Sequence, residues 1–450
     1  MTDPVWSSAT ELSAAYRSGA LSPVAVTQAL LARIEKLEPS LNAFIRRETD
    51  TALLAARESE ARWRQGKPYS ALDGVPYGLK DVIDAAGQPT TCHSALRLHH
   101  IAAQDAHVTA LMRKAGAVFL GKLATHEFAL GGPSFDLPFP PARNPWNRDH
   151  HPGGSSSGAG VAVAAGMLPF ALGTDTAGSI RNPAGACGVV GLKATYGLVS
   201  RTGVFPLAPS LDHVGPLCRT AADAALLLEL LSENPGVYTR DLDKGIAGLR
   251  IGVERNFLRL CEPQVAAALD KAMAALAAAG AEIHDAVLPD LTFLQTVNRV
   301  ILQAEGWSIH ADDLRQRAGM FAASTRKRLL PGAFLSAEDL LRAQRLRRRV
   351  IGEVQRLFQQ ADILLVPNSF DPICRIDDAA ALQHTYARQA RAPFNLTGHP
   401  AISLPAGLCG KGLPISLQLA GRYGDEATLL RAAAGLERLM PWHDKRPKLD

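Results

Sequence analysis

The chain has 450 residues, of which 47% are hydrophobic and 20% are charged, and its formal net charge is +5. This charge is too small to indicate direct binding of nucleic acid. The six cysteines form no CxxC pair, which argues against a zinc site or a redox motif. The N-terminus lacks the pattern of a signal peptide, and no apolar run is long enough to span a membrane, so we expect a cytoplasmic protein without a membrane anchor.

The N-terminal segment, residues 1–66, is predicted to be helical. Apolar residues recur at helical spacing through 22–39. Ser22 followed by Pro23 is a typical start for that helix, because the serine can cap it and the proline suits its first turn. An alanine-rich stretch at 50–65 predicts a second helix.

Beyond the N-terminal helices, strand and helix patterns alternate, first through a core at about 70–220. β-Branched residues and flanking glycines mark the strands, and a glycine- and serine-rich loop at 153–158 precedes a helix of small residues. This alternation indicates βαβ units, so we expect an α/β fold with a large mixed, mostly parallel sheet and helices on both faces. The predicted elements are strands at 74–83, 117–120, 167–173, 249–254 and 281–287, and helices at 106–115, 221–232 and 264–279.

Residues 290–360 are expected to be helical and are rich in arginine. Ser336 and Asp339 have the spacing of a capping box that opens a helix. A solvated helix face is the simpler interpretation of the arginines, and a carboxylate-binding or partner surface is the alternative. The arginines that lie closest together are Arg342, Arg345, Arg347, Arg348 and Arg349.

After residue 360, strand-like segments at 363–367 and 401–405 are expected to return to the sheet. The chain contains no internal repeat and no long linker. We therefore predict a single domain over 1–450.

Two serine sites lie in glycine-rich surroundings within 153–181. Glycine lets a ligand approach the main chain closely. The backbone N–H groups of one loop could point inward together and form an oxyanion hole, with Ser179 as a nucleophile in the same loop. The residues of this predicted oxyanion hole are Thr176, Ala177, Gly178 and Ser179.

A serine nucleophile needs a base. The nearest histidines, His150 and His151, precede the serine loop in a charged segment. Lys80 lies in an apolar strand pattern, and burial would lower the pKa of its ammonium from about 10.4 towards 7. The alternative is a buried ion pair of Lys80 with Asp81 or Asp84, which the pattern alone favours.

Three separated motifs make the chain similar to the amidase signature family. They are DGVPYGLKDVID, then GGSSSG with GTDTAGSIRNPAGACGVVGLKAT, and finally FNLTGHPAISLP with GLPISLQLAG. The resemblance implies an amidase that uses a Ser-Ser-Lys triad and needs neither a metal nor an organic cofactor. Lys80 would be the terminal base, Ser155 the serine with a cis peptide bond, and Ser179 the nucleophile that forms the acyl-enzyme.

The resemblance also implies supporting residues around the triad. Asp175 and Arg181 flank the nucleophile and resemble the supporting ion pair of the family. Ser156, beside Ser155, is a further supporting residue.

Other motifs are weaker. Residues 154–158 match G-x-S-x-G, which would make Ser156 the nucleophile, but the segment before them is a poor strand. Residues 116–122 imitate a phosphate-binding loop, but Leu123 stands where Ser or Thr is needed. Cys187 needs no function beyond that of a small buried residue.

Residues 304–315 and 341–345 resemble the catalytic subunit of 1-carboxybiuret hydrolase of the cyanuric acid pathway. That branch implies a small urea-like amide with a carboxylate, and Arg315 is a candidate for binding this anion. It also implies an oligomer, either a homodimer or a paired heterotetramer with a small helical partner subunit.

Three alternatives remain open. One is the glutaminase subunit of a tRNA-dependent amidotransferase, although its expected Tyr-Asp-Gly element is not found. The others are a general small-molecule amidase and a non-catalytic protein that keeps the fold. The intact triad positions disfavour the last of these.

Overall fold

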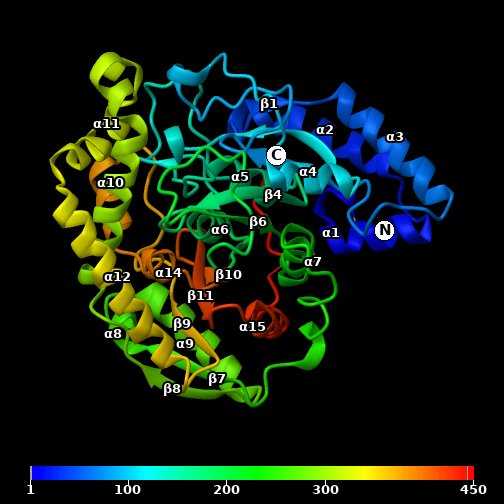
Figure 1. Ribbon diagram of the computed structural model, residues 1–450. Helices are drawn as coiled ribbons and strands as arrows, with labels where there is room; N and C mark the ends of the chain where they lie inside the picture. The colour runs from blue at the N-terminus through cyan, green and yellow to red at the C-terminus, as the bar shows by residue number, and fades with distance from the viewer. Residues whose placement is uncertain (1–2, 443, 450) are drawn as a thin grey trace.

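The computed structural model describes residues 3–442 and 444–449. In this part of the chain, eleven strands form one sheet with the order β1-β3-β2-β4-β6-β5-β10-β11-β9-β7-β8 (Figure 1). The strands are β1 (Phe44–Arg47), β2 (Pro76–Lys80), β3 (Val118–Leu123), β4 (Phe170–Asp175), β5 (Val190–Lys193), β6 (His213–Cys218), β7 (Arg250–Glu254), β8 (Glu282–Ala286), β9 (Ile363–Pro367), β10 (Ala401–Leu408) and β11 (Pro414–Gly421).

The sheet is mixed, as expected, but the expectation that most pairings are parallel is wrong. β2 pairs in parallel with β3 and β4, and β7 with β8 and β9. The other pairings among the described strands are antiparallel. The reason is the connections, because antiparallel strands need only a short turn whereas parallel strands need a long crossover. β10 and β11, for example, are joined by residues 409–413 alone.

Helices cover the sheet in two groups. α5 and α6 pack against each other and against the central strands, and α7, α9 and α15 form the second group. No helix of the described residues is long and apolar enough to cross a membrane. The α-helices are α1 (Ala9–Ser18), α2 (Pro23–Leu41), α3 (Asp50–Arg64), α4 (His107–Lys114), α5 (Ser157–Ala164), α6 (Arg181–Cys187), α7 (Ala221–Leu231), α8 (Arg255–Leu258), α9 (Pro263–Ala278), α10 (Leu291–Arg317), α11 (Ala323–Leu329), α12 (Ala337–Leu357), α13 (Ala379–Ala387), α14 (Ala392–Thr397) and α15 (Glu426–Leu439).

The predicted N-terminal helices are confirmed as α2 and α3. The Ser22 hydroxyl caps α2 by accepting hydrogen bonds from the N–H groups of Val24 and Ala25. The apolar stripe of α2, which includes Val26 and Leu30, is buried in the main core.

The predicted strand at 74–83 is shorter in the structure, where β2 ends at Lys80. The N–H groups of Val82 and Ile83 both donate to the Lys80 carbonyl oxygen, so the chain turns there. β1, β5 and β6 were not expected. β6 contains Pro216, a residue that normally argues against a position inside a sheet.

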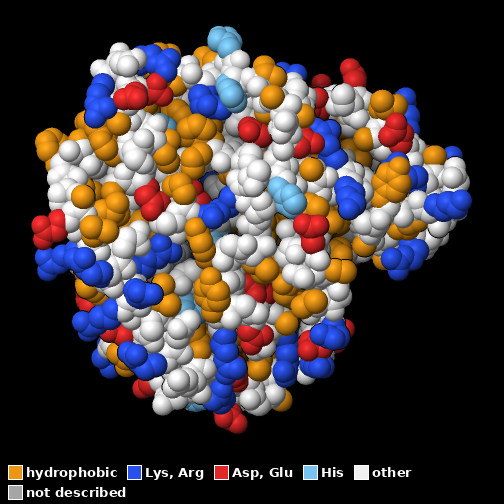
Figure 2. All heavy atoms as spheres, in the orientation of Figure 1, with side chains coloured by type: hydrophobic (Ala, Val, Ile, Leu, Met, Phe, Trp, Pro, Cys, Tyr) orange, Lys and Arg blue, Asp and Glu red, His pale blue; other side chains and the backbone are white. Residues whose placement is uncertain are grey.

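The arginine-rich segment forms α10, α11 and α12, on the side of the molecule opposite α1–α3 (Figure 1). Ser336 and Asp339 form the expected capping box of α12. Blue and orange side chains lie over this edge in Figure 2. The exposed arginines of α12 include Arg342, Arg345, Arg348 and Arg349.

Arg347 differs from its neighbours because it points into the molecule. Its Nε donates to the Leu396 carbonyl at 2.7 Å, and its Nη2 donates to the Ser210 carbonyl at 2.8 Å. This arginine therefore ties α12 to the segments beside it, while the others form a solvated face.

Candidate active site

Lys80 lies at the end of β2, in the interior of the sheet, and its side chain is fully buried. Its Nζ donates hydrogen bonds to Ser155 Oγ and Thr174 Oγ1, both at 2.7 Å. Asp81 lies instead 3.3 Å from Lys122 Nζ, because successive strand residues point to opposite faces. The alternative of an ion pair between Lys80 and Asp81 is therefore wrong.

Burial of Lys80 lowers the pKa of its ammonium to about 7, although the more distant carboxylates of Asp175 and Asp212 raise it. No carboxylate in the described residues lies within ion-pair distance of Lys80 Nζ. A substantial fraction of the amine is therefore neutral at pH 7, and a neutral amine can accept a proton.

Ser155 lies in the loop between β3 and α5, and the peptide bond between Gly154 and Ser155 is cis, as expected. His126 covers this peptide: its N–H donates to the Ser155 carbonyl at 3.1 Å. A Cβ atom on Gly154 would lie only 2.0 Å from His126 Cε1, so the ring touches the loop where no side chain fits. The close contact holds Ser155 in place beside Lys80.

Ser156 joins the two serine loops. Its buried Oγ donates to the Thr174 carbonyl and accepts from the Thr174 N–H, and its own N–H donates to the Ser179 carbonyl at 3.1 Å. This hydroxyl is already engaged on both sides. The geometry gives Ser156 a positioning role and does not favour the alternative in which it is the nucleophile.

Ser179 follows β4 and is partly exposed, unlike Lys80 and Ser155. The described hydrogen bonds include none from its hydroxyl to Ser155. Gly178 before it has a φ of +117°, a conformation that favours glycine, and this sharp turn presents the serine. The structure thus brings Lys80 and Ser155 into contact and places Ser179 at the neighbouring loop.

The predicted oxyanion hole is only partly available. The Gly178 N–H donates to Asp175 Oδ1 at 2.7 Å, so the expectation that all four N–H groups of the loop are free is wrong for Gly178. The N–H groups of Thr176, Ala177 and Ser179 have no recorded partner in the described part of the chain. These three remain as donors for a developing oxyanion.

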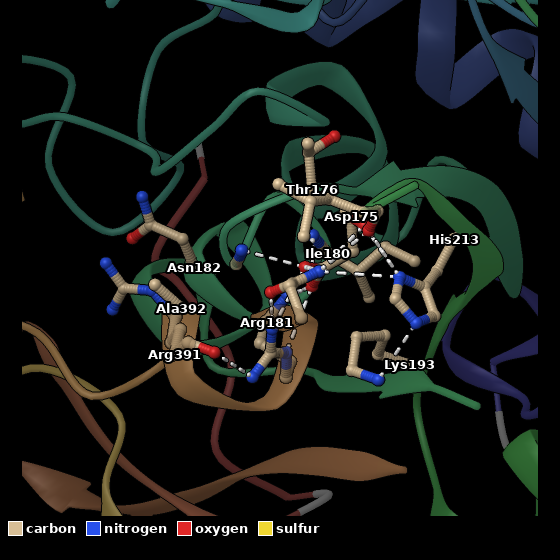
Figure 3. A network of polar contacts seen from close by, with 12 residues as sticks. Asp175, Thr176, Ile180, Arg181, Asn182, Lys193, His213, Arg391 and Ala392 are labelled. Atoms are coloured by element: carbon tan, nitrogen blue, oxygen red, sulfur yellow. Dashed lines mark hydrogen bonds and ion pairs between the residues drawn. The ribbon is translucent and has the colours of Figure 1, made fainter. Parts of the chain in front are cut away.

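Asp175 and Arg181 form a fully buried ion pair with two hydrogen bonds, Nε to Oδ2 at 3.0 Å and Nη2 to Oδ1 at 2.9 Å (Figure 3). Burial alone raises the pKa of Asp175, but the Arg181 guanidinium and its hydrogen bonds hold that pKa well below its usual range. Asp175 Oδ2 also accepts from the Ile180 N–H at 3.1 Å. The pair therefore fixes both ends of the nucleophile loop.

Further buried groups complete the network, and sequence reasoning missed them. Arg181 Nη1 donates to Gln418 and its Nη2 to Asn395, both at 2.6 Å. Burial lowers the pKa of Lys193 well below its usual value, and its Nζ lies 3.3 Å from His213 Nε2. Lys193, Asn395 and Gln418 all belong to the three family motifs, which was the available signal.

Two other predicted residues lie away from this centre. Arg315 is 63% exposed at the C-terminal end of α10, where it pairs with Asp312 at 3.0 Å and lies over the Trp307 ring. It contacts neither serine loop, so its assignment as the anion-binding residue is corrected. Cys187 is buried, and burial raises the pKa of its thiol. In residues 3–442 and 444–449, no three His, Cys, Asp or Glu side chains are grouped so that they could hold a metal ion.

The family model for amidases matches residues 25–430 of the chain. This chain belongs to the amidase family. Among characterised amidase relatives, it is 38% identical to a glutamyl-tRNA(Gln) amidotransferase subunit of Myxococcus xanthus, over 95% of its length and 96% of that protein. It is 36% identical to the protein of the same name from Chloroflexus aurantiacus, with 98% of each chain covered.

Solved amidase structures share the fold. A structure described as a vestigial protein complex that reveals the origins of an s-triazine catabolic enzyme superposes with a TM-score of 0.90 and 32% identity, covering 98% of this chain and 100% of that one. Peptide amidase from Stenotrophomonas maltophilia gives a TM-score of 0.87 and 29% identity, with 99% of each chain covered. The chain is therefore a hydrolase of carbon–nitrogen amide bonds.

Proposed function

We propose that the protein hydrolyses a small amide through an acyl-enzyme on Ser179, with Ser155 and Lys80 as the proton relay. The observation that carries this proposal is the contact of 2.7 Å between a buried, carboxylate-free lysine and the Ser155 hydroxyl. A lysine in that state is a base, and Ser155 is the only triad serine that it touches directly.

The acylation step starts with neutral Lys80. Its Nζ accepts the Ser155 hydroxyl proton as Ser155 Oγ accepts the proton of Ser179, and Ser179 Oγ attacks the amide carbon. The relay needs a hydrogen bond between the two serines that the free enzyme does not make. We expect it to form when substrate is bound, because catalytic contacts often tighten only then.

The tetrahedral intermediate then breaks down. Its oxygen accepts hydrogen bonds from the free N–H groups of the 176–179 loop. Ser155 gives its proton to the departing nitrogen and takes one back from the Lys80 ammonium, so the amine leaves neutral. Water attacks the acyl-enzyme through the same relay in reverse and restores Ser179.

Two substrates are supported by different observations. The names of the most similar relatives support a glutaminase role in a tRNA-dependent amidotransferase, which is the better supported of the two. The structural likeness to the s-triazine catabolic complex supports 1-carboxybiuret, together with the resemblance of residues 304–315. In this chain that segment is part of α10, where Glu305 accepts hydrogen bonds from Ser210.

A hydrolysis panel separates these candidates. Ammonia release would be followed for glutamine, biuret, 1-carboxybiuret, allophanate and an aryl amide, with the Ser179→Ala variant as control. Preference for glutamine, with copurification of a large tRNA-binding subunit, would establish the glutaminase. Preference for 1-carboxybiuret would establish the urea-like substrate. Full activity of Ser179→Ala on any of them would contradict the proposed mechanism.

A partner subunit is part of the proposal. Large apolar side chains are exposed near the arginines of α12, with Phe334 87% exposed and Leu341 57% exposed. Such residues suit a protein interface. Copurification and native mass measurement of the chain, with and without Phe334→Ser and Leu341→Ser, test whether this edge binds a small subunit or a second copy.

A further inference from the structure

Arg391 is a buried arginine without an ion pair. Its residue is 3% exposed, and it lies in the segment before α14, next to the nucleophile loop. Its Nη1 donates to the Asn368 carbonyl and to Ser369 Oγ, both at 2.6 Å. No carboxylate of the described residues lies within ion-pair distance of it.

Part of the Arg391 guanidinium lacks partners. Nε is buried with no hydrogen bond, and no hydrogen bond from Nη2 to a described residue is recorded. A buried cation without an anion costs free energy, as does a buried donor without an acceptor. Natural proteins keep such a group where a ligand completes it, so these donors mark a site for an anion.

The guanidinium lines a small cavity of about 50 Å³. Since one water needs roughly 10–15 Å³ by this measure, the space accommodates a group the size of a carboxylate. Asp371 is the one acidic residue lining it, and both of its oxygens already accept from Arg388 Nε, at 3.1 and 2.9 Å. The cavity therefore offers a positive charge with no negative charge free to oppose it.

The cavity lies beside both serine loops. A Cβ atom on Gly178 would lie 2.6 Å from Arg391 Nε, so the guanidinium is in direct contact with the residue before the nucleophile. Asn182, three residues after Ser179, lines the same cavity and donates from Nδ2 to the Gly154 carbonyl at 3.3 Å. In Figure 3 the Asn182 and Arg391 side chains lie together, directed away from the buried Asp175–Arg181 pair.

We propose that Arg391 binds a carboxylate carried by the amide substrate, and so selects anionic amides over neutral ones. This inference rests on the proposed function, because it places that carboxylate beside the Ser179 loop. Arg391 takes the role first assigned to Arg315. A planar guanidinium with two free donors is suited to a carboxylate, which can accept both.

The first test measures selectivity. The monoamides of dicarboxylic acids with two to five carbons would each be compared with a neutral amide of the same length, such as succinamate with 4-oxopentanamide. We expect at least a tenfold preference in kcat/KM for the best anionic amide. In Arg391→Met this ratio should fall at least tenfold, mainly through KM. No preference in the wild type, or an unchanged ratio in the variant, would overturn the inference.

Arg219→Met is the matched control. Arg219 is also buried and also donates to main-chain carbonyls, those of Val5 and Leu168, but it does not line this cavity. Its loss should leave the selectivity ratio unchanged. An equal fall of the ratio in Arg219→Met would show a general effect of removing a buried arginine and would overturn the assignment.

The second test needs no turnover. Binding of succinate and its shorter and longer homologues to Ser179→Ala and to Ser179→Ala/Arg391→Met would be measured by calorimetry. We expect the second variant to bind the best dicarboxylate at least tenfold more weakly. Equal binding by both would overturn the role of Arg391. Full amidase activity of Ser179→Ala would instead overturn the proposed function, so the two failures are distinguishable.

Discussion

Lys80 Nζ lies 2.7 Å from Ser155 Oγ, on the opposite side of β2 from Asp81, whose carboxylate lies 3.3 Å from Lys122. This separation is what leaves Lys80 without a counter-ion. A paired lysine would stay protonated at neutral pH, whereas an unpaired buried one loses its proton near pH 7. The catalytic proposal depends on that difference.

The pH dependence of activity follows from the same lysine. Since the neutral amine is the base and its pKa is about 7, kcat/KM should rise about tenfold from pH 6 to pH 8 and then level off. A pH–rate profile with a small amide substrate measures this. Lys80→Met should lower kcat by about a thousandfold or more and remove the inflection.

Glu437→Gln is the control for that profile. Burial raises the pKa of Glu437 to about 7 as well, but its carboxylate accepts from the Ala221 N–H at the start of α7, away from the triad. The inflection near pH 7 should persist in this variant. Its disappearance there, or its survival in Lys80→Met, would show that Lys80 is not the titrating base.

The ion pair of Asp175 and Arg181 predicts a large effect on stability. Asp175→Asn leaves a fully buried guanidinium without its charge partner, which should cost about 3–5 kcal/mol in the free energy of unfolding. Urea denaturation measures this change. Asp149→Asn, which removes an exposed partner of Arg375, should have no measurable effect. Equal midpoints for Asp175→Asn and the wild type would contradict the argument.

Gly154→Ala should impair catalysis more than folding. The added Cβ would lie 2.0 Å from the His126 ring, so the loop that carries Ser155 must shift. A displacement of about 1 Å in a catalytic group can cost about a hundredfold in rate, and we expect kcat to fall by that order. Gly132→Ala is the control, because its Cβ would meet nothing within 4 Å. Equal kcat values for the two variants would contradict this account.

The sequence predicted the helices with clear periodicity, and it predicted the catalytic residues through motifs. α2 was evident from Val26, Leu30 and their neighbours, since its stripe is local. β6 was not, because Pro216 is tolerated there only by its sheet neighbours. The balance of parallel and antiparallel pairs depends on how distant strands meet, which no local pattern records.

The site shows the same limit. The pattern around Lys80 favoured an ion pair with Asp81, and only the alternation of strand faces in the folded sheet excludes it. Arg391 could not be found from spacing either, because it lies 212 positions after Ser179 and meets Gly178 only in three dimensions. Its one signal was a position just before the motif FNLTGHPAISLP.

The central claim is that Ser179 is the nucleophile activated through Ser155 and Lys80. Labelling with a fluorophosphonate, followed by peptide mass spectrometry, tests it most directly. We predict a single adduct on Ser179, whose rate of formation rises from pH 6 to pH 8 and falls at least a hundredfold in Lys80→Met. An adduct on Ser156, or labelling of Ser179 that Lys80→Met leaves unchanged, would contradict it.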